Sequence, residues 1–127
     1  MKALVLGATA LALSATSGVA QDSSFADPAH FTGTSGEQVY TGLCQGCHMP
    51  DGEGAVGAGA YPPLAGNEKL ESADYPIYLV IHGQKAMPPL GEILNDQQIA
   101  AVVEYIRTHF GNNYPEPVPV ESVAAAR

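Results

Sequence analysis

The sequence has few basic residues, few cysteines and no long hydrophobic run. Its 127 residues include 5 Lys or Arg against 13 Asp or Glu, and the formal net charge is −8 at pH 7. Because so few cations cannot neutralise phosphates, a nucleic acid or an anionic membrane is a poor partner, whereas a basic protein surface would be attracted. Two cysteines are too few for a disulfide-rich scaffold, so their spacing decides their role.

The longest apolar run, from Ala3 to Ala15, is too short and too rich in small residues to be a good membrane span. A lysine precedes this run and small residues follow it, which is typical of a cleavable secretory signal. We therefore predict a signal peptide over residues 1–20 and a periplasmic location for the mature protein.

The remaining residues are enough for one small domain. Residues 21–34 are rich in Ser, Asp, Gly and Pro and show no period, so we predict a flexible N-terminal arm. The domain is expected over residues 35–111. Prolines at alternate positions in residues 112–127 predict an extended, mobile C-terminal tail.

Helix signals begin at Ser35, which opens a capping-box pattern for a helix that should end near Cys47 or His48. Residues 74–83 fit either a buried strand or a helix. We prefer the helix because no second strand-like run is present to pair with it. Residues 50–66 are rich in glycine and proline and should form neither helix nor strand.

The clearest predicted element is the last helix. Apolar residues recur with helical spacing from Ile99 to Phe110, and Gly111 supplies the stop signal. The domain is therefore expected to be all-α, with three short helices joined by two irregular loops.

Cys44, Cys47 and His48 form a C-x-x-C-H motif, which is typical of c-type haem attachment. Offsets of three and four residues place all three on one face of a helical turn. Two thiols can then add to two vinyl groups at one edge of a haem, with the imidazole under the iron. A redox disulfide would need a βαβ context, and a zinc site would need a second ligand pair, both of which the sequence lacks. We therefore predict one covalent haem c.

With this motif, the chain resembles the class I cytochromes c, small single-haem proteins of bacterial periplasms. The resemblance covers residues 35–110 and rests on three motifs in order. They are Cys44–His48, Tyr61–Gly66 and Ala86–Pro89. It implies an all-α class I cytochrome c fold, with three to four short helices around one haem.

The resemblance also implies the axial ligands. His48 is the expected ligand on one face of the haem, and Met87, in a Met-Pro loop, is the expected ligand on the other. Met49 is adjacent to His48 and cannot reach the opposite face. His82 is the chemical rival of Met87 and would create a bis-histidine site.

Further positions follow from the same resemblance. Pro62, with Pro63 as the alternative, is expected to accept a hydrogen bond from the ligating histidine and to fix its ring. Gly36 or Tyr40 in the first helix is expected to cross Tyr105 in the last. Six apolar residues are candidate pocket liners: Tyr61, Leu64, Tyr78, Ile81, Leu90 and Ile99.

Histidine–methionine ligation predicts electron transfer. A thioether favours Fe(II) and raises the potential, and two strong ligands leave no open iron position for oxygen or peroxide. The sequence also lacks an enzyme-like set of catalytic residues. The sequences of these motifs resemble those of short cytochromes that serve periplasmic dehydrogenases with quinone, flavin or molybdenum cofactors. We therefore predict a periplasmic dehydrogenase as the partner. The alternatives are a free shuttle to a terminal oxidase or another cytochrome, and a ligand-binding haem protein with an open iron site.

Overall fold

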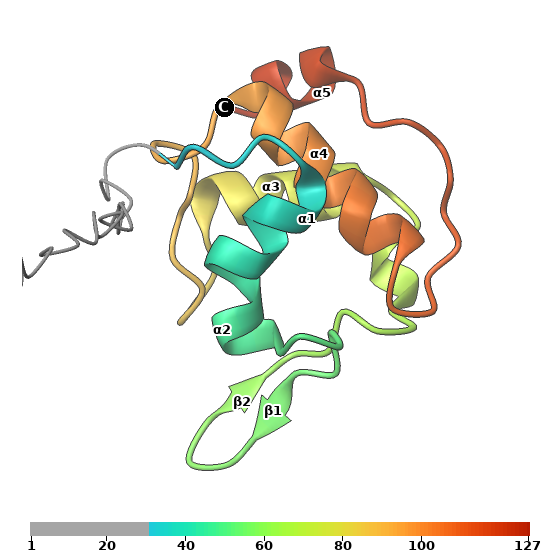
Figure 1. Ribbon diagram of the computed structural model, residues 1–127. Coiled ribbons are helices and arrows are strands. Elements are labelled where there is room, and N and C mark those ends of the chain that lie inside the picture. Colours follow the sequence, from blue (N-terminus) through green and yellow to red (C-terminus); the bar gives the residue numbers. More distant parts are fainter. Residues whose placement is uncertain (1–30) are drawn as a thin grey trace, which may run out of the picture.

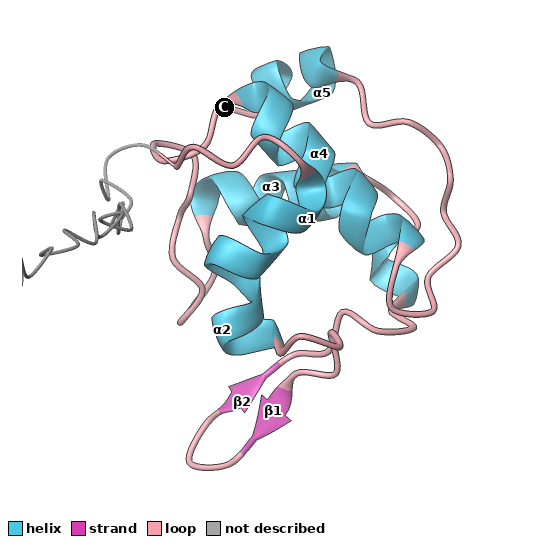
Figure 2. Ribbon diagram, in the orientation of Figure 1, coloured by secondary structure: helices cyan, strands magenta, loops and turns pink. Residues whose placement is uncertain are grey.

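The computed structural model describes residues 31–127, so the predicted signal peptide lies outside the described residues. The helices in the described part are α1 (Gly36–Val39), α2 (Gln45–His48), α3 (Asp74–His82), α4 (Asp96–Thr108) and α5 (Val120–Ala125). A π-helical turn, η1 (Tyr40–Cys44), joins α1 to α2, and a 3₁₀ turn, η2 (Glu68–Leu70), precedes α3. Strands β1 (Ala55–Val56) and β2 (Ala60–Tyr61) form a small antiparallel hairpin (Figures 1 and 2). None of these helices is long and apolar enough to cross a membrane.

The first helical segment begins and ends where the sequence predicts. The Ser35 hydroxyl accepts a hydrogen bond from the Gln38 backbone N–H at 3.1 Å, and the Gln38 side chain accepts one from the Ser35 N–H at 3.1 Å. This reciprocal cap starts α1. In η1, the Gln45 N–H donates to the Tyr40 carbonyl, five residues earlier. The π-helical turn leads directly into α2, which ends at His48.

The first and last helices of the predicted domain cross at a glycine, which confirms the predicted crossing. A Cβ atom added to Gly36 would overlap the backbone oxygen of Ala101 and lie 2.6 Å from the Tyr105 Cβ. The Tyr40 and Tyr105 rings pack beside this point with their centroids 5.6 Å apart. Only a residue without a side chain lets the two helices approach this closely.

The core lies where α1, α3 and α4 meet. Its most deeply buried apolar side chains are Val39, Tyr40, Ile77, Ile99, Val102, Val103 and Val123. The segment over residues 74–83 is the preferred helix, α3, and not a strand. Its buried positions include Ile77 and Val80, which face the core from one side of the helix.

The hairpin corrects one prediction. Residues 50–66 were expected to contain no strand, yet Ala55 pairs with Tyr61 and Val56 with Ala60. The pairing is possible because Gly54 adopts a φ of +67° and approaches Tyr61 so closely that a Cβ would overlap its backbone oxygen. Glycine is thus required for the ladder.

The predicted tail also needs correction, whereas residues 21–30 of the predicted arm lie outside the described residues. Residues 112–127 are not a loose tail: from the end of α4 they run back beside it, and α5 packs against α4, as the orange-to-red ribbon of Figure 1 shows. Val118 and Val123 are buried there, and Val123 belongs to the helix α5. Burial of these valines outweighs the extended bias of the prolines. At the other end, the Gln98 side chain donates to the carbonyls of Phe31 and Gly33 at 2.7 Å, so the described part of the arm is anchored.

Candidate functional site

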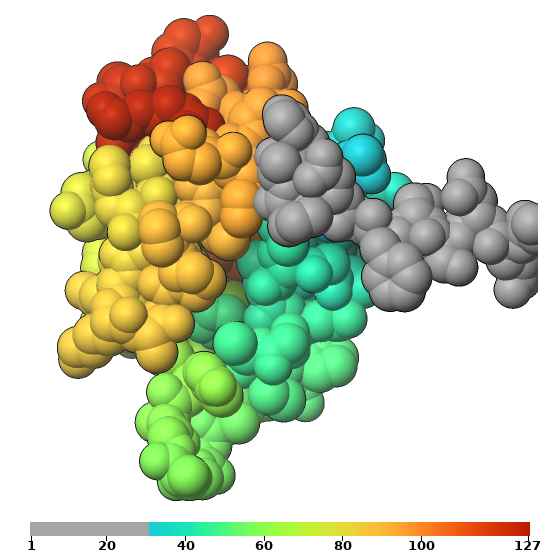
Figure 3. All heavy atoms as spheres, turned by 90° about the vertical axis from the view of Figure 1, so that its left-hand side faces the viewer, coloured from blue at the N-terminus to red at the C-terminus, as the bar shows by residue number. Residues whose placement is uncertain are grey.

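All five predicted site residues line one cavity. The cavity has a volume of about 550 Å³, and its walls include Cys44, Cys47, His48, Pro62 and Met87. Its size is within the range of sites for small molecules and cofactors. Figure 3 views the molecule from the side on which the α3–α4 loop (gold) lies beside the α1–α2 segment (teal), with the hairpin projecting below.

The cavity wall is mostly apolar. Its aliphatic residues are Leu43, Leu64, Leu70, Leu79, Val80, Leu90, Val102 and Ile106. Among residues 31–127, no Asp or Glu residue belongs to the wall. Two lysines, Lys69 and Lys85, are the charged residues that line it. A large apolar group fits such a wall, because burial removes its surface from water.

The His48 ring has a defined orientation. Its Nδ1 atom lies 2.9 Å from the Pro62 carbonyl oxygen, and the side chain is buried. Because a carbonyl oxygen only accepts, Nδ1 carries the proton and donates it. The Nε2 lone pair is then left free for a metal ion, which is the usual arrangement for a ligating histidine. Pro62, and not Pro63, makes this bond.

The Pro62 carbonyl is held in place by the loop around it. The backbone N–H groups of Leu64 and Ala65 both donate to the Gly52 carbonyl, at 2.7 Å and 3.0 Å. The Gly54 N–H donates to the His48 carbonyl at 3.0 Å, which ties the hairpin to the end of α2. These bonds fix the loop against α2.

Asn112 braces the same loop and was missed by sequence reasoning, which placed it in a mobile tail. Its side-chain N–H₂ donates to the carbonyls of Leu64 and Ile106 at 2.8 Å, and its side-chain oxygen accepts from the Asn67 N–H at 2.9 Å. The sequence carries no signal for this role, since all the partners are backbone groups.

The two cysteines differ in exposure. Cys47 is exposed, whereas Cys44 is partly buried beneath the end of η1. Burial, with a smaller contribution from Cys47, raises the pKa of the Cys44 thiol to about 12. Redox-active and metal-binding cysteines need an accessible thiolate, which the partly buried Cys44 does not offer. Within residues 31–127, no group of three His, Cys, Asp or Glu residues is arranged to hold a metal ion.

Met87 reaches the cavity from the α3–α4 loop. Gln84 and Met87 exchange both backbone hydrogen bonds, at 3.0 Å and 2.9 Å, which closes a tight turn. Lys85 occupies the left-handed region within this turn, with φ of 54°. The turn presents the half-buried Met87 side chain at the cavity wall.

The rival residues lie elsewhere. Met49 is outside the cavity wall, and its carbonyl accepts a hydrogen bond from the Tyr40 hydroxyl at 2.6 Å. His82 is also outside the wall: it is exposed, and its Nε2 atom lies 2.8 Å from the Ala126 carbonyl oxygen. Among the six candidate pocket liners, Tyr61, Leu64 and Leu90 line the cavity, whereas Tyr78, Ile81 and Ile99 do not.

These residues fit a covalently attached haem. One wall offers two thiols and an imidazole with its Nε2 atom free, another offers a thioether, and the space between is apolar. A helical fold around such a cavity defines a cytochrome c domain.

Comparisons with known proteins also identify a cytochrome c domain. A family model described as "Cytochrome C oxidase, cbb3-type, subunit III" matches residues 32–106, and the chain belongs to this family of cytochrome c domains. The cytochrome c subunit of a quinone-dependent alcohol dehydrogenase from Gluconacetobacter polyoxogenes is 35% identical over 72% of this chain and 22% of its own length. The chain thus spans about a fifth of that relative.

Smaller cytochromes match over nearly their whole length. Cytochrome c6 from Diacronema lutheri is 36% identical over 61% of this chain and 95% of that protein. The crystal structure of cytochrome c6C from Synechococcus sp. PCC 7002 superposes with a TM-score of 0.50 and 26% identity, covering 60% of this chain and 94% of that one. The class I cytochrome c fold predicted from the sequence is therefore confirmed.

Proposed function

We propose that this protein is a periplasmic one-electron carrier with one haem c, attached through Cys44 and Cys47 and ligated by His48 and Met87. The observation that carries the proposal is the cavity itself, which collects all four side chains while the Pro62 carbonyl orients the His48 ring. When bound, the haem supplies an iron that alternates between Fe(III) and Fe(II).

The surrounding residues contribute orientation and insulation. The hydrogen bond to Pro62 keeps the His48 Nε2 atom directed toward the iron position. Met87 would hold the iron from the other wall of the cavity, and with His48 it would leave no site for oxygen or peroxide. The aliphatic wall excludes water, which limits solvent reorganisation when the charge of the iron changes. The exposed Cys47 marks the edge through which electrons enter and leave.

The test compares two methionine variants. Met87→Ala should keep the haem attached, lose the near-infrared methionine–iron band and lower the reduction potential, because the preference of the thioether for Fe(II) is removed. Met49→Ala is the matched control and should keep both properties. Intact mass after acid precipitation reports haem attachment, and absorption spectra in both redox states report ligation. An unchanged spectrum and potential in Met87→Ala would contradict the assignment.

The proposed electron donor is a periplasmic dehydrogenase. Support comes from the relatives, since cytochrome subunits of alcohol and fructose dehydrogenases are 34–35% identical to this chain. The second candidate is a free shuttle, which the nearly full-length match to cytochrome c6 favours.

Purification from the native periplasm at low ionic strength distinguishes the two. A dehydrogenase-linked protein should copurify with an oxidoreductase whose substrate reduces the haem within the isolated complex. A protein that elutes alone and is oxidised by membranes containing a terminal oxidase would support the shuttle instead.

A further inference from the structure

Arg127 contacts the chain at the junction between the α3–α4 loop and α4. Its guanidinium group donates to the Gly91 carbonyl at 2.5 Å, to the Leu94 carbonyl at 2.8 Å and to the Asp96 carboxylate at 2.5 Å. The Arg127 side chain is 33% exposed and that of Asp96 27%. Three acceptors around one partly buried guanidinium define a specific contact.

The neighbouring residue holds the other end of the loop. The His82 Nε2 atom donates to the Ala126 carbonyl oxygen across 2.8 Å. His82 is the last residue of α3, and the loop over residues 83–95 starts directly after it. Ala126 and Arg127 therefore contact both ends of the segment that carries Met87.

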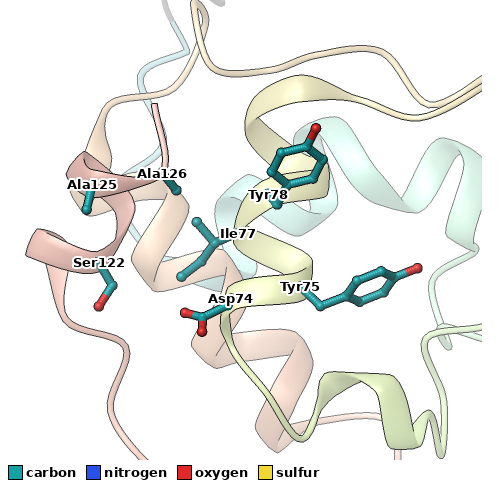
Figure 4. Close-up of a pocket in the computed structure, with 7 residues that line it drawn as sticks. All are labelled: Asp74, Tyr75, Ile77, Tyr78, Ser122, Ala125 and Ala126. Atoms are coloured by element: carbon teal, nitrogen blue, oxygen red, sulfur yellow. The ribbon is translucent and has the colours of Figure 1, made fainter.

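The position of these two residues is set by α5, which packs mainly against α4 and also lies beside α3. Figure 4 shows the seam between α3 and α5, where the Ile77 side chain points toward Ala125 and Ala126 while the Tyr75 ring points away. Val123 of α5 is fully buried. The segment after α5 is thus fixed by its own apolar contacts before Arg127 makes its polar ones.

We propose that Arg127 is a positioning residue for Met87: it anchors the α3–α4 loop so that the thioether stays at the iron. This inference rests on the proposed function. The strap (residues 112–127) lies beyond residues 32–106, which match the family model. Arg127 therefore lies outside the segment that the family model matches.

The loop has its own backbone contacts with α3. The Leu90 N–H donates to the Val80 carbonyl at 2.9 Å, and the Gly91 N–H to the Ile81 carbonyl at 3.2 Å. Gly91 also accepts from Arg127, so the guanidinium supports the loop at the point where it packs back against the end of α3. Without this support, the loop should open more often between Gly83 and Gly91.

An external ligand measures this opening. Imidazole can bind the iron only when Met87 has left it, so the apparent affinity for imidazole scales with the open fraction of the loop. Removal of the guanidinium should raise the affinity for imidazole about tenfold.

The experiment uses the haem-loaded protein and three variants. Arg127→Gln and Asp96→Asn break the same ion pair but change the net charge in opposite directions, so an increase in imidazole affinity in both excludes a general charge effect. Glu121→Gln, exposed on α5, is the control and should behave as the wild type. Hydrogen–deuterium exchange should accelerate in residues 83–95 of Arg127→Gln and remain unchanged for the core amides of Val102 and Val103.

Two results would overturn the proposal, and they are distinguishable. If Met87→Ala binds imidazole more tightly than the wild type but Arg127→Gln does not, Met87 is a ligand and Arg127 does not position it. If Met87→Ala and the wild type bind imidazole equally and neither shows the methionine–iron band, the ligand assignment itself is wrong and the positioning role falls with it.

Discussion

Gly36→Ala tests the helix crossing on which the position of the cavity wall depends. The new methyl group would overlap the Ala101 carbonyl oxygen and lie 2.6 Å from the Tyr105 Cβ. The Ala101 oxygen is part of the α4 backbone and the Tyr105 Cβ is bonded directly to it, so no side-chain rotation relieves the contact. Overpacking of this kind costs about 1–3 kcal/mol, partly offset by the higher helix propensity of alanine. We expect the free energy of unfolding to fall by about 2 kcal/mol.

Gly46→Ala is the matched control for this substitution. Gly46 lies in α2, and an added Cβ would meet no other heavy atom within 4 Å. It gains the same propensity without the clash, so its stability should be unchanged or slightly higher. Thermal unfolding followed by circular dichroism should place the midpoint of Gly36→Ala roughly 10 °C below that of the wild type. Equal midpoints for the two variants would refute the close approach of α1 and α4.

Two further predictions concern buried polar groups. Arg107 is 3% exposed and donates to three backbone carbonyls. Arg107→Gln should therefore lower the free energy of unfolding by about 3 kcal/mol. Its ion-pair partner Glu116 has a side chain that is 73% exposed, so Glu116→Gln should change this free energy by less than about 0.5 kcal/mol. Equal losses for the two variants in urea unfolding would contradict this prediction. Burial raises the pKa of Tyr40 from 10.0 to about 12. The contribution of the neutral phenol to the free energy of unfolding is therefore fully present below pH 10, and it is lost between pH 10 and pH 12 as the phenol of the unfolded chain ionises. Tyr40→Phe should weaken this decline in urea unfolding measured across the same window, and an identical decline in both proteins would assign it to other groups.

The position of the site on the chain could be predicted because its strongest signals are local. Cys44, Cys47 and His48 lie within a single helical turn, and their spacing alone restricts the chemistry. The hydrogen bond between His48 and Pro62 was predicted from the family resemblance, and the structure confirms it. The preference for Pro62 over Pro63 rested on the resemblance alone, because the position of the carbonyl depends on how Gly52 and Gly54 turn the loop.

The role of the strap could not be predicted because its contacts are distant in the sequence. Three prolines dominate its local pattern and suggest an extended chain, whereas Val118 and Val123 are too few to produce a helical period. Their burial depends on the surfaces of α3 and α4, which exist only after folding. The buried position of Arg107 was missed for a related reason. Its main partners are backbone carbonyls, which every residue has, so no residue type in the sequence indicates these contacts.

The two sides of the cavity are therefore secured in different ways. On the His48 side, the motif, the hairpin and the Pro62 carbonyl all lie within residues 44–62, so a local rearrangement would disturb attachment and ligation together. On the Met87 side, the loop depends on residues 126 and 127, about 40 positions away in the sequence. Substitutions in the strap can consequently change the hold on Met87 while leaving the thiols and His48 in place. Under the proposed ligation by His48 and Met87, such a division would let the hold on Met87 vary without loss of the covalent attachment at Cys44 and Cys47.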